Sequence, residues 1–118
     1  MAATSGAGRI ISLEKAQELH AQNKALFLDA RPDAWYEMGH IRSAKNLPPS
    51  QFDELFDKVM GNTPKNQTIV TYCDGEGCEL SHDLAVALVQ KGFTNVHVLV
   101  NGWTLWSESG LPIEEGIL

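Results

Sequence analysis

Short apolar runs alternate with amphipathic helical patterns along this chain, and that alternation constrains its fold more than any other feature. The clearest strand pattern is Thr-Ile-Val-Thr-Tyr at residues 68–72, in which β-branched and aromatic side chains predominate. Residues 25–28 and 96–100 are similar runs, and apolar residues recur at helical spacing over 13–23 and 79–91. Strands that alternate with helices predict an α/β fold around a mostly parallel sheet.

Shorter elements fill the rest of the chain. Ser12 and Ser50 are each placed to cap the helix that follows, and Gly92 is placed to end the helix at 79–91. The sequence also predicts an edge strand at Ile10-Ile11, a short helix at 32–38, an extended segment at 41–46, a helix after Ser50 and a short helix at 103–107.

The length of 118 residues indicates one domain. No internal repeat, low-complexity tract or linker divides the sequence. We expect a loose tail at 1–9, a folded domain at 10–113 and a second tail at 114–118. The chain could also be part of a longer protein.

The charge balance narrows the range of functions. Asp plus Glu is 15 and Lys plus Arg is 9, so the net charge is −6. This acidity argues against partners such as nucleic acids and anionic membranes, which require basic surfaces. The sequence has no apolar run of about 18 residues for a membrane helix and no signal-peptide core at its start. We therefore expect a soluble, cytoplasmic protein.

Cys73 is the strongest candidate for chemistry. It follows the strand at 68–72 directly, and a Gly-bearing loop and a helix start come after it. Ligands of parallel α/β sheets bind at the carboxyl ends of the strands, and loop N–H groups with a helix N-terminus stabilise an anion there. A thiol in that setting is favoured as the reactive thiolate. The alternative interpretation is that Cys73 is only a small buried residue at a strand end, without a chemical role.

Four stretches share their pattern with one family. They read Leu-Asp-Ala-Arg at 28–31, Glu-Met-Gly-His-Ile-Arg-Ser-Ala-Lys-Asn-Leu-Pro at 37–48, Val-Thr-Tyr-Cys at 70–73, and Asn-Gly-Trp-Thr-Leu-Trp at 101–106 with Gly-Leu-Pro at 110–112. In these stretches, over roughly residues 10 to 113, the chain resembles the rhodanese-like superfamily, including its Asp-x-Arg, Gly-His-Ile and Gly-Gly-Trp-x-x-Trp patterns.

The resemblance implies a three-layer fold, with about five mostly parallel strands and helices on both faces of the sheet. It also implies sulfane-sulfur transfer through a persulfide on Cys73 by a ping-pong mechanism, without a cofactor. The partners would be a small sulfur donor or acceptor, or a thiol-bearing protein. Asp29 and Arg31 would support the site, either by bracing the loop or as a structural salt bridge. The substrate-binding loop would consist of Asp74, Gly75, Glu76, Gly77, Cys78 and Glu79.

The loop departs from the family pattern, which has an Arg after the Cys and another at the helix start. No Lys or Arg occurs between Lys65 and Lys91, and Asp74, Glu76 and Glu79 are acidic. A Cys-x5-Arg phosphatase or arsenate reductase loop is excluded, because Glu79 occupies the Arg position. Each negative charge about 4 Å from a bound anion weakens the binding free energy by roughly 1 to 4 kcal/mol. We therefore expect a persulfide or a protein donor rather than free thiosulfate.

Cys78 leaves several interpretations open. The two cysteines could form a redox pair, which resolves a persulfide as a disulfide or passes sulfur between the thiols. Cys78 could instead pack under the start of the following helix. Together with His82 the cysteines are weak evidence for zinc, and we predict no metal site.

Two functions other than sulfur transfer fit the sequence. The acidic loop fits a non-catalytic rhodanese-fold module for interaction or sensing, and the two cysteines fit a thiol–disulfide redox sensor. Formation of a persulfide on Cys73 would distinguish an enzyme from the interaction module, and a reversible Cys73–Cys78 disulfide would indicate the sensor. Among the other side chains, we expect His40 to be structural and Trp35, Trp103 and Trp106 to pack in the core.

Overall fold

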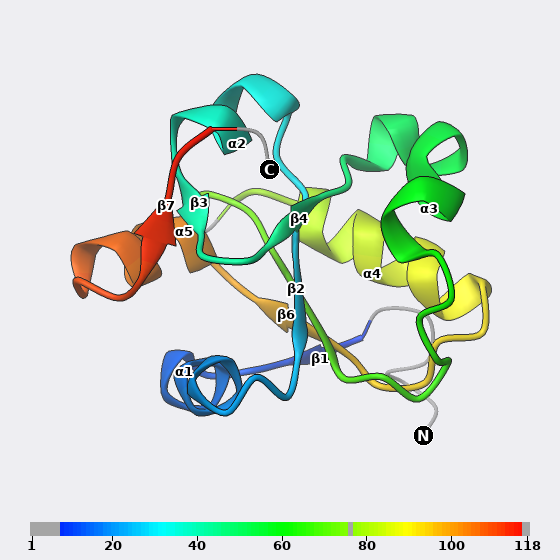
Figure 1. Cartoon of the computed structure of the whole chain (residues 1–118), viewed down its shortest axis with the longest axis horizontal. Helices are drawn as coiled ribbons and strands as arrows, with labels where there is room; N and C mark the ends of the chain where they lie inside the picture. Colours follow the sequence, from blue (N-terminus) through cyan, green and yellow to red (C-terminus); the bar gives the residue numbers. More distant parts are fainter. Residues whose placement is uncertain (1–7, 76, 117–118) are drawn as a thin grey trace.

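A computed structural model of the chain describes residues 8–75 and 77–116. Five strands form a parallel sheet in the order β1-β6-β5-β2-β4 (Figure 1). These strands are β1 (Arg9–Ile10), β2 (Leu26–Asp29), β4 (Lys45–Asn46), β5 (Ile69–Tyr72) and β6 (Val96–Leu99). The helices are α1 (Leu13–Ala21), α2 (Asp33–Met38), the 3-10 turn η2 (Pro49–Gln51), α3 (Phe52–Met60), α4 (Leu80–Gln90) and α5 (Gly102–Glu108).

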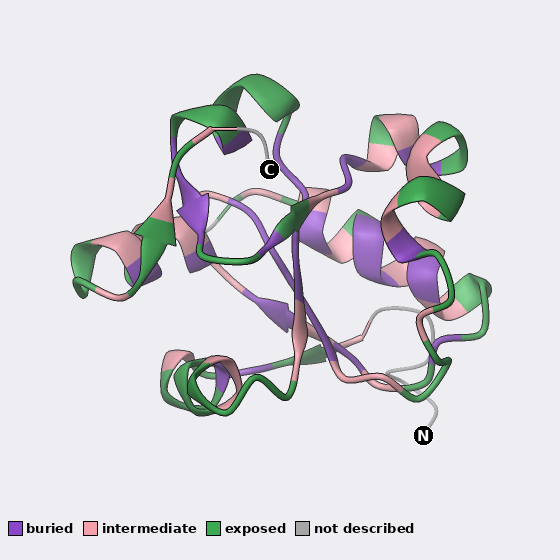
Figure 2. Cartoon of the chain, viewed as in Figure 1, coloured by how far each residue is buried: buried purple, intermediate pink, exposed green. Residues whose placement is uncertain are grey.

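Two separate cores lie on the two faces of this sheet. On one face, side chains of α3 and α4 such as Met60 and Leu88 pack against Leu28 of β2. On the other face, Ala16 of α1 and Trp106 of α5 pack against strand residues whose side chains point the opposite way. Figure 2 shows the central strands largely buried between the helices. The predicted three-layer α/β fold is confirmed.

The register of the central strands aligns their carboxyl ends. Asp29 of β2 pairs with Tyr72 of β5, and Tyr72 pairs with Leu99 of β6. The residues that follow these strands therefore meet at one edge of the sheet. Cys73 follows β5, so it lies at the middle of that edge.

The structure differs from the sequence prediction in the middle of the segment 41–46, where a turn replaces the continuous extended run. β3 (His40–Ile41) and β4 are separate strands, with Ser43 between them in a left-handed conformation at φ 70°. β3 pairs antiparallel with β7 (Ile113–Glu114) in a second sheet of two strands. The carboxylate of Glu114 accepts a hydrogen bond from Ser43 N at 2.7 Å. Glu114 is therefore part of the fold and not of the predicted tail.

One predicted cap was also wrong. Ser50 lies inside the 3-10 turn η2 instead of capping α3, because the turn begins directly at Pro49. Ser12 behaves as predicted, and its hydroxyl accepts a hydrogen bond from Lys15 N at 3.1 Å. Within the described part of the chain, no helix is long and apolar enough to cross a bilayer.

Candidate functional site

Cys73 lies at the carboxyl end of β5, on the wall of a cavity. Its residue is 3% exposed, and the adjoining cavity has a volume of about 260 Å³. Leu80, the first residue of α4, lines the same cavity, so the N-terminus of that helix is near the sulfur. The described residues that line the cavity are Arg31, Pro32, Trp35, Cys73, Asp74 and Leu80.

The first half of the loop after Cys73 is held by α5. Gly75 N donates to Oδ1 of Asn101 at 2.9 Å, and the Thr104 hydroxyl donates to Oδ1 of Asp74. Trp103 N donates to the carbonyl oxygen of Cys73 at 3.0 Å. Gly75 has a φ of 87°, which glycine adopts without strain. The predicted substrate-binding loop is therefore braced at its start by a helix distant in sequence.

The close approach of α5 to this edge depends on Gly102. A Cβ on Gly102 would lie 2.7 Å from the Cβ of Tyr72, closer than two such atoms can pack. The missing side chain lets the first turn of α5 contact the end of β5. This contact places the Trp103 amide against Cys73.

The structure joins Cys73 and Cys78 in a disulfide with a Cα–Cα distance of 6.4 Å. Cys78 is half-buried, whereas Cys73 is almost fully buried. The turn between them is closed by Cys78 N, which donates to the carbonyl oxygen of Gly75 at 3.4 Å. Of the predicted loop residues, Gly77 and Glu79 are exposed, and Glu76 lies outside the described residues.

Asp29 and Arg31 form a buried ion pair behind the loop. Nη2 of Arg31 lies 2.6 Å from Oδ2 of Asp29, and the side chains are 4% and 0% exposed. Burial alone would lower the pKa of Arg31, but the hydrogen bond and charge of Asp29 outweigh it and raise that pKa. Nη2 also donates to the carbonyl oxygen of Gly39 at 2.6 Å, and the guanidinium lies 4.6 Å from the centre of the Trp103 ring. The pair thus supports the site structurally.

Arg31 also gives the cavity its positive charge. Among the described residues that line the cavity, Arg31 is the single Lys or Arg and Asp74 is the single carboxylate. The sequence showed no basic residue in the loop, and the structure supplies one from the end of β2. Because Asp29 already neutralises much of this charge, the cavity is not strongly cationic.

Three residues of the site escaped the sequence reasoning. Trp35 was expected in the core, but it is 54% exposed and lines the cavity, because α2 presents it beside Arg31. Asn101 and Thr104 brace the loop from α5. The one available signal was Asn101 itself, which stands where the family pattern has a glycine. Trp106 is fully buried, as predicted.

The buried histidine at this end of the molecule is structural, as expected. His40 is fully buried, its ring stacks on Tyr36 at 3.7 Å, and Nδ1 lies 2.7 Å from the Tyr36 carbonyl oxygen. His82 is half-buried on α4. Among residues 8–75 and 77–116, no three His, Cys, Asp or Glu side chains are grouped to hold a metal ion.

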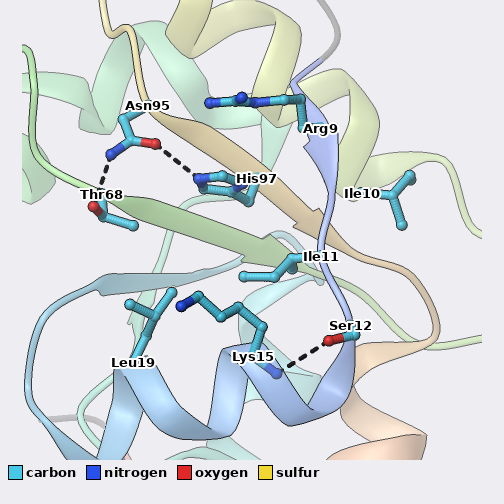
Figure 3. Close-up of a pocket in the computed structure, with 9 residues that line it drawn as sticks. All are labelled: Arg9, Ile10, Ile11, Ser12, Lys15, Leu19, Thr68, Asn95 and His97. Carbon is cyan, nitrogen blue, oxygen red and sulfur yellow. Dashed lines mark hydrogen bonds between the residues drawn. The ribbon is translucent and has the colours of Figure 1, made fainter.

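A larger cavity of about 470 Å³ lies at the opposite, amino-terminal ends of β5 and β6 (Figure 3). Asn95 links its polar side by donating to the Thr68 hydroxyl and accepting from Nε2 of His97, both at 2.8 Å. Ile11 and Leu19 form part of its apolar wall. The described residues that line this cavity include no cysteine, and the hydroxyl of Ser12, which does line it, caps α1. The smaller cavity at Cys73 is therefore the candidate site for covalent chemistry.

The amino-acid sequence matches a family model described as the Rhodanese-like domain over residues 12–109. Thiosulfate sulfurtransferase GlpE of Actinobacillus pleuropneumoniae is 32% identical over 104 residues, which cover 88% of this chain and 91% of that protein. The tRNA uridine(34) hydroxylase of Aster yellows witches'-broom phytoplasma is 32% identical over 118 residues. That match covers 98% of this chain and 37% of the hydroxylase.

Another relative is an HTH-type transcriptional regulator of Mycobacterium tuberculosis, 33% identical over 89 residues, with 75% of this chain and 37% of the regulator covered. The chain therefore spans about a third of the regulator and of the hydroxylase.

Among solved structures, the BH2092 protein from Bacillus halodurans superposes with a TM-score of 0.79 at 23% identity, covering 92% of this chain and 77% of that one. A rhodanese-like domain from Anabaena superposes with a TM-score of 0.70 at 25% identity, covering 92% and 79%.

Proposed function

The chain belongs to the rhodanese-like domain family, and from that premise we propose that it is a sulfurtransferase which carries sulfane sulfur as a persulfide on Cys73. The observation that carries the proposal is the position of Cys73, at the carboxyl end of the central strand and on the wall of a cavity. Nucleophiles and ligands of parallel α/β sheets occupy that edge.

The reaction uses the reduced form of the site. The Cys73 thiolate attacks the outer sulfur of a donor persulfide, the S–S bond of the donor breaks, and the donor leaves as a thiolate. Cys73 then holds the extra sulfur as a persulfide. In the second half of the cycle an acceptor thiolate attacks this outer sulfur and restores the Cys73 thiolate. Arg31 and the N-terminus of α4 favour the anionic sulfur at both stages.

Charge at the cavity supports a persulfide or a protein donor over free thiosulfate. The Arg31 guanidinium is engaged by Asp29, and Asp74 adds a negative charge on the cavity wall. A thiosulfate dianion gains little from such a site, whereas the reacting sulfane group of a low-molecular-weight persulfide brings at most one negative charge into the cavity. The exposed Trp35 beside the cavity fits a thiol-bearing partner protein, since aromatic side chains are frequent anchors at interfaces.

We also place this activity in the cytoplasm. There, thiol reductants return Cys73 and Cys78 to the reduced state that the first step requires.

Intact mass after loading tests the proposal. The reduced protein would be incubated separately with thiosulfate and with glutathione persulfide, and wild type would be compared with Cys73→Ser and Cys78→Ser. A gain of about 32 Da in Cys78→Ser that is absent from Cys73→Ser is the expected result. Absence of any gain in folded Cys78→Ser with both donors would refute sulfur transfer and favour an interaction module.

The disulfide favours one second candidate, a thiol–disulfide redox sensor. A sensor forms the Cys73–Cys78 bond with an oxidant such as hydrogen peroxide and does not load sulfur. Alkylation of both thiols before and after mild oxidation, beside the persulfide assay, separates the two functions.

A further inference from the structure

The side chain of Cys78 forms a disulfide with that of Cys73, the proposed nucleophile. We infer that Cys78 resolves the Cys73 persulfide, so that the domain has an internal route that releases sulfane sulfur as hydrosulfide, in competition with its transfer to an external acceptor. This inference rests on the proposed sulfur transfer, and it adds a reaction product and a reductant class to it.

The chemistry balances in three steps. First, the Cys73 thiolate takes the outer sulfur of a donor persulfide, and the donor leaves as a thiolate. Second, the Cys78 thiolate attacks Sγ of Cys73, the Cys73–sulfane bond breaks, and hydrosulfide leaves with the electron pair of that bond. This step forms the disulfide that the structure contains. Third, a dithiol reductant of the thioredoxin type reduces the disulfide and becomes a disulfide itself.

The geometry favours this internal attack. The Cα atoms of Cys73 and Cys78 are 6.4 Å apart in the disulfide-bonded loop, which is within the usual range for a disulfide. The hydrogen bonds from Gly75 to Asn101 and from Thr104 to Asp74 hold the connecting turn. A nucleophile positioned in this way reacts as if at very high concentration, so it competes well with free thiols.

Burial assigns different roles to the two sulfurs. Cys73 is 3% exposed, whereas Cys78 is half-buried at the outer end of the loop. A protein dithiol therefore reaches the sulfur of Cys78 more readily than that of Cys73. Attack on Cys78 expels the Cys73 thiolate, the form that the next loading step requires. The same asymmetry leaves the persulfide on Cys73 less accessible to external acceptors than to Cys78.

A purely structural disulfide is the competing explanation. Such a bond would staple a short surface turn, and its loss would change stability without changing sulfur chemistry. The position of Cys73 on the cavity wall argues against this role, because a disulfide that only stabilises the turn does not need a cysteine that lines the cavity. Stability and product measurements on the same variant distinguish the two explanations.

The experiment follows one turnover of fully reduced, desalted protein with one equivalent of glutathione persulfide. Wild type is expected to release one hydrosulfide per chain without any added thiol and to lose about 2 Da by intact mass, as a disulfide does. Cys78→Ser is expected to retain about 32 Da and to release at least tenfold less hydrosulfide. Cys73→Ser and a protein-free sample correct for spontaneous decay of the donor.

Thiol dependence gives a second readout. Hydrosulfide release by wild type in the first turnover should not depend on added glutathione, whereas release by Cys78→Ser should rise in proportion to it. Thermal unfolding of the reduced proteins confirms that Cys78→Ser is folded.

The two proposals fail differently. If wild type retains the added sulfur and releases no hydrosulfide, the role of Cys78 is overturned and sulfur transfer stands. If Cys78→Ser gains no sulfur although it is folded, sulfur transfer is refuted, and the role of Cys78 is refuted with it.

Discussion

Arg31 donates to the carboxylate of Asp29 through both Nε and Nη2, in an ion pair almost completely removed from solvent. The same guanidinium contacts the Trp103 ring and lines the cavity at Cys73. The pair therefore connects the end of β2 to the first turn of α5. A change in either partner should affect the whole edge of the sheet that contains the candidate site.

Removing the charge of Arg31 should destabilise the protein strongly. Arg31→Met leaves Asp29 buried without its cation, and breaking such a pair costs about 3 to 5 kcal/mol of unfolding free energy. Arg42→Met, at an exposed position, should cost less than about 0.5 kcal/mol. Urea unfolding measures both. Arg31→Met combined with Asp29→Leu should recover part of the loss, and equal costs for Arg31→Met and Arg42→Met would contradict a structural role for the pair.

Gly102→Ala should loosen the contact between α5 and β5. The added methyl would lie 2.7 Å from the Cβ of Tyr72, and relief of such overpacking costs about 1 to 3 kcal/mol. Gly77→Ala is the matched control, because its added methyl meets no atom within 4 Å. Thermal unfolding with both variants in the reduced state measures the difference. A Gly102→Ala protein as stable as Gly77→Ala would show that α5 moves away freely.

Asp74→Asn should increase loading by thiosulfate. The substitution removes the carboxylate charge from the cavity wall and retains an oxygen that accepts from Thr104. One like charge at about 4 Å in water is worth about 1 kcal/mol, so the thiosulfate loading rate should rise about fivefold. The rate with glutathione persulfide should change less. The gain should shrink at high ionic strength, and Glu18→Gln on α1 should not produce it.

His97 should make stability fall on acidification. Burial lowers its pKa below 6.5, and repulsion from Arg9 lowers it further. The unfolded chain therefore takes up the proton at a higher pH than the folded protein does. The contribution of His97 to the unfolding free energy is complete above pH 6.5 and is lost as the pH falls toward the folded pKa.

Urea unfolding between about pH 7.5 and about pH 5 measures this effect. His97→Gln should show a smaller loss of stability over that interval than wild type. Arg9→Gln should show an intermediate loss, because it removes the repelling charge and leaves the burial. An unchanged pH dependence in His97→Gln would show that other groups cause the acid loss.

The sequence predicted those elements that are determined locally. Residues 69–72 are a strand because four successive side chains are buried between two helical layers, and the apolar run reveals this directly. The position of Cys73 followed from the end of that run. β7 escaped prediction because Ile113 and Glu114 form a strand only by pairing with His40 and Ile41, which are distant in the sequence.

The site was predictable to a similar degree. The loop after Cys73 and the pair of Asp29 and Arg31 were identified from their motifs. That Arg31 lines the cavity depends on the register of β2 with β5, which a sequence does not display. Trp35 was expected in the core because tryptophan side chains are mostly buried in proteins. Its exposure in the structure depends on the direction in which α2 leaves the sheet.

Asn101 has a φ of 55°, and its side chain accepts a hydrogen bond from Gly75 N. The backbone requires a residue that tolerates the left-handed region, and the loop requires an acceptor on its side chain. A glycine at this position would tolerate the backbone conformation but would have no side-chain acceptor. An aspartate would meet both requirements and would add a negative charge. Position 101 is therefore a point at which protein engineering can adjust the order of the loop after Cys73 without a substitution in the sheet itself.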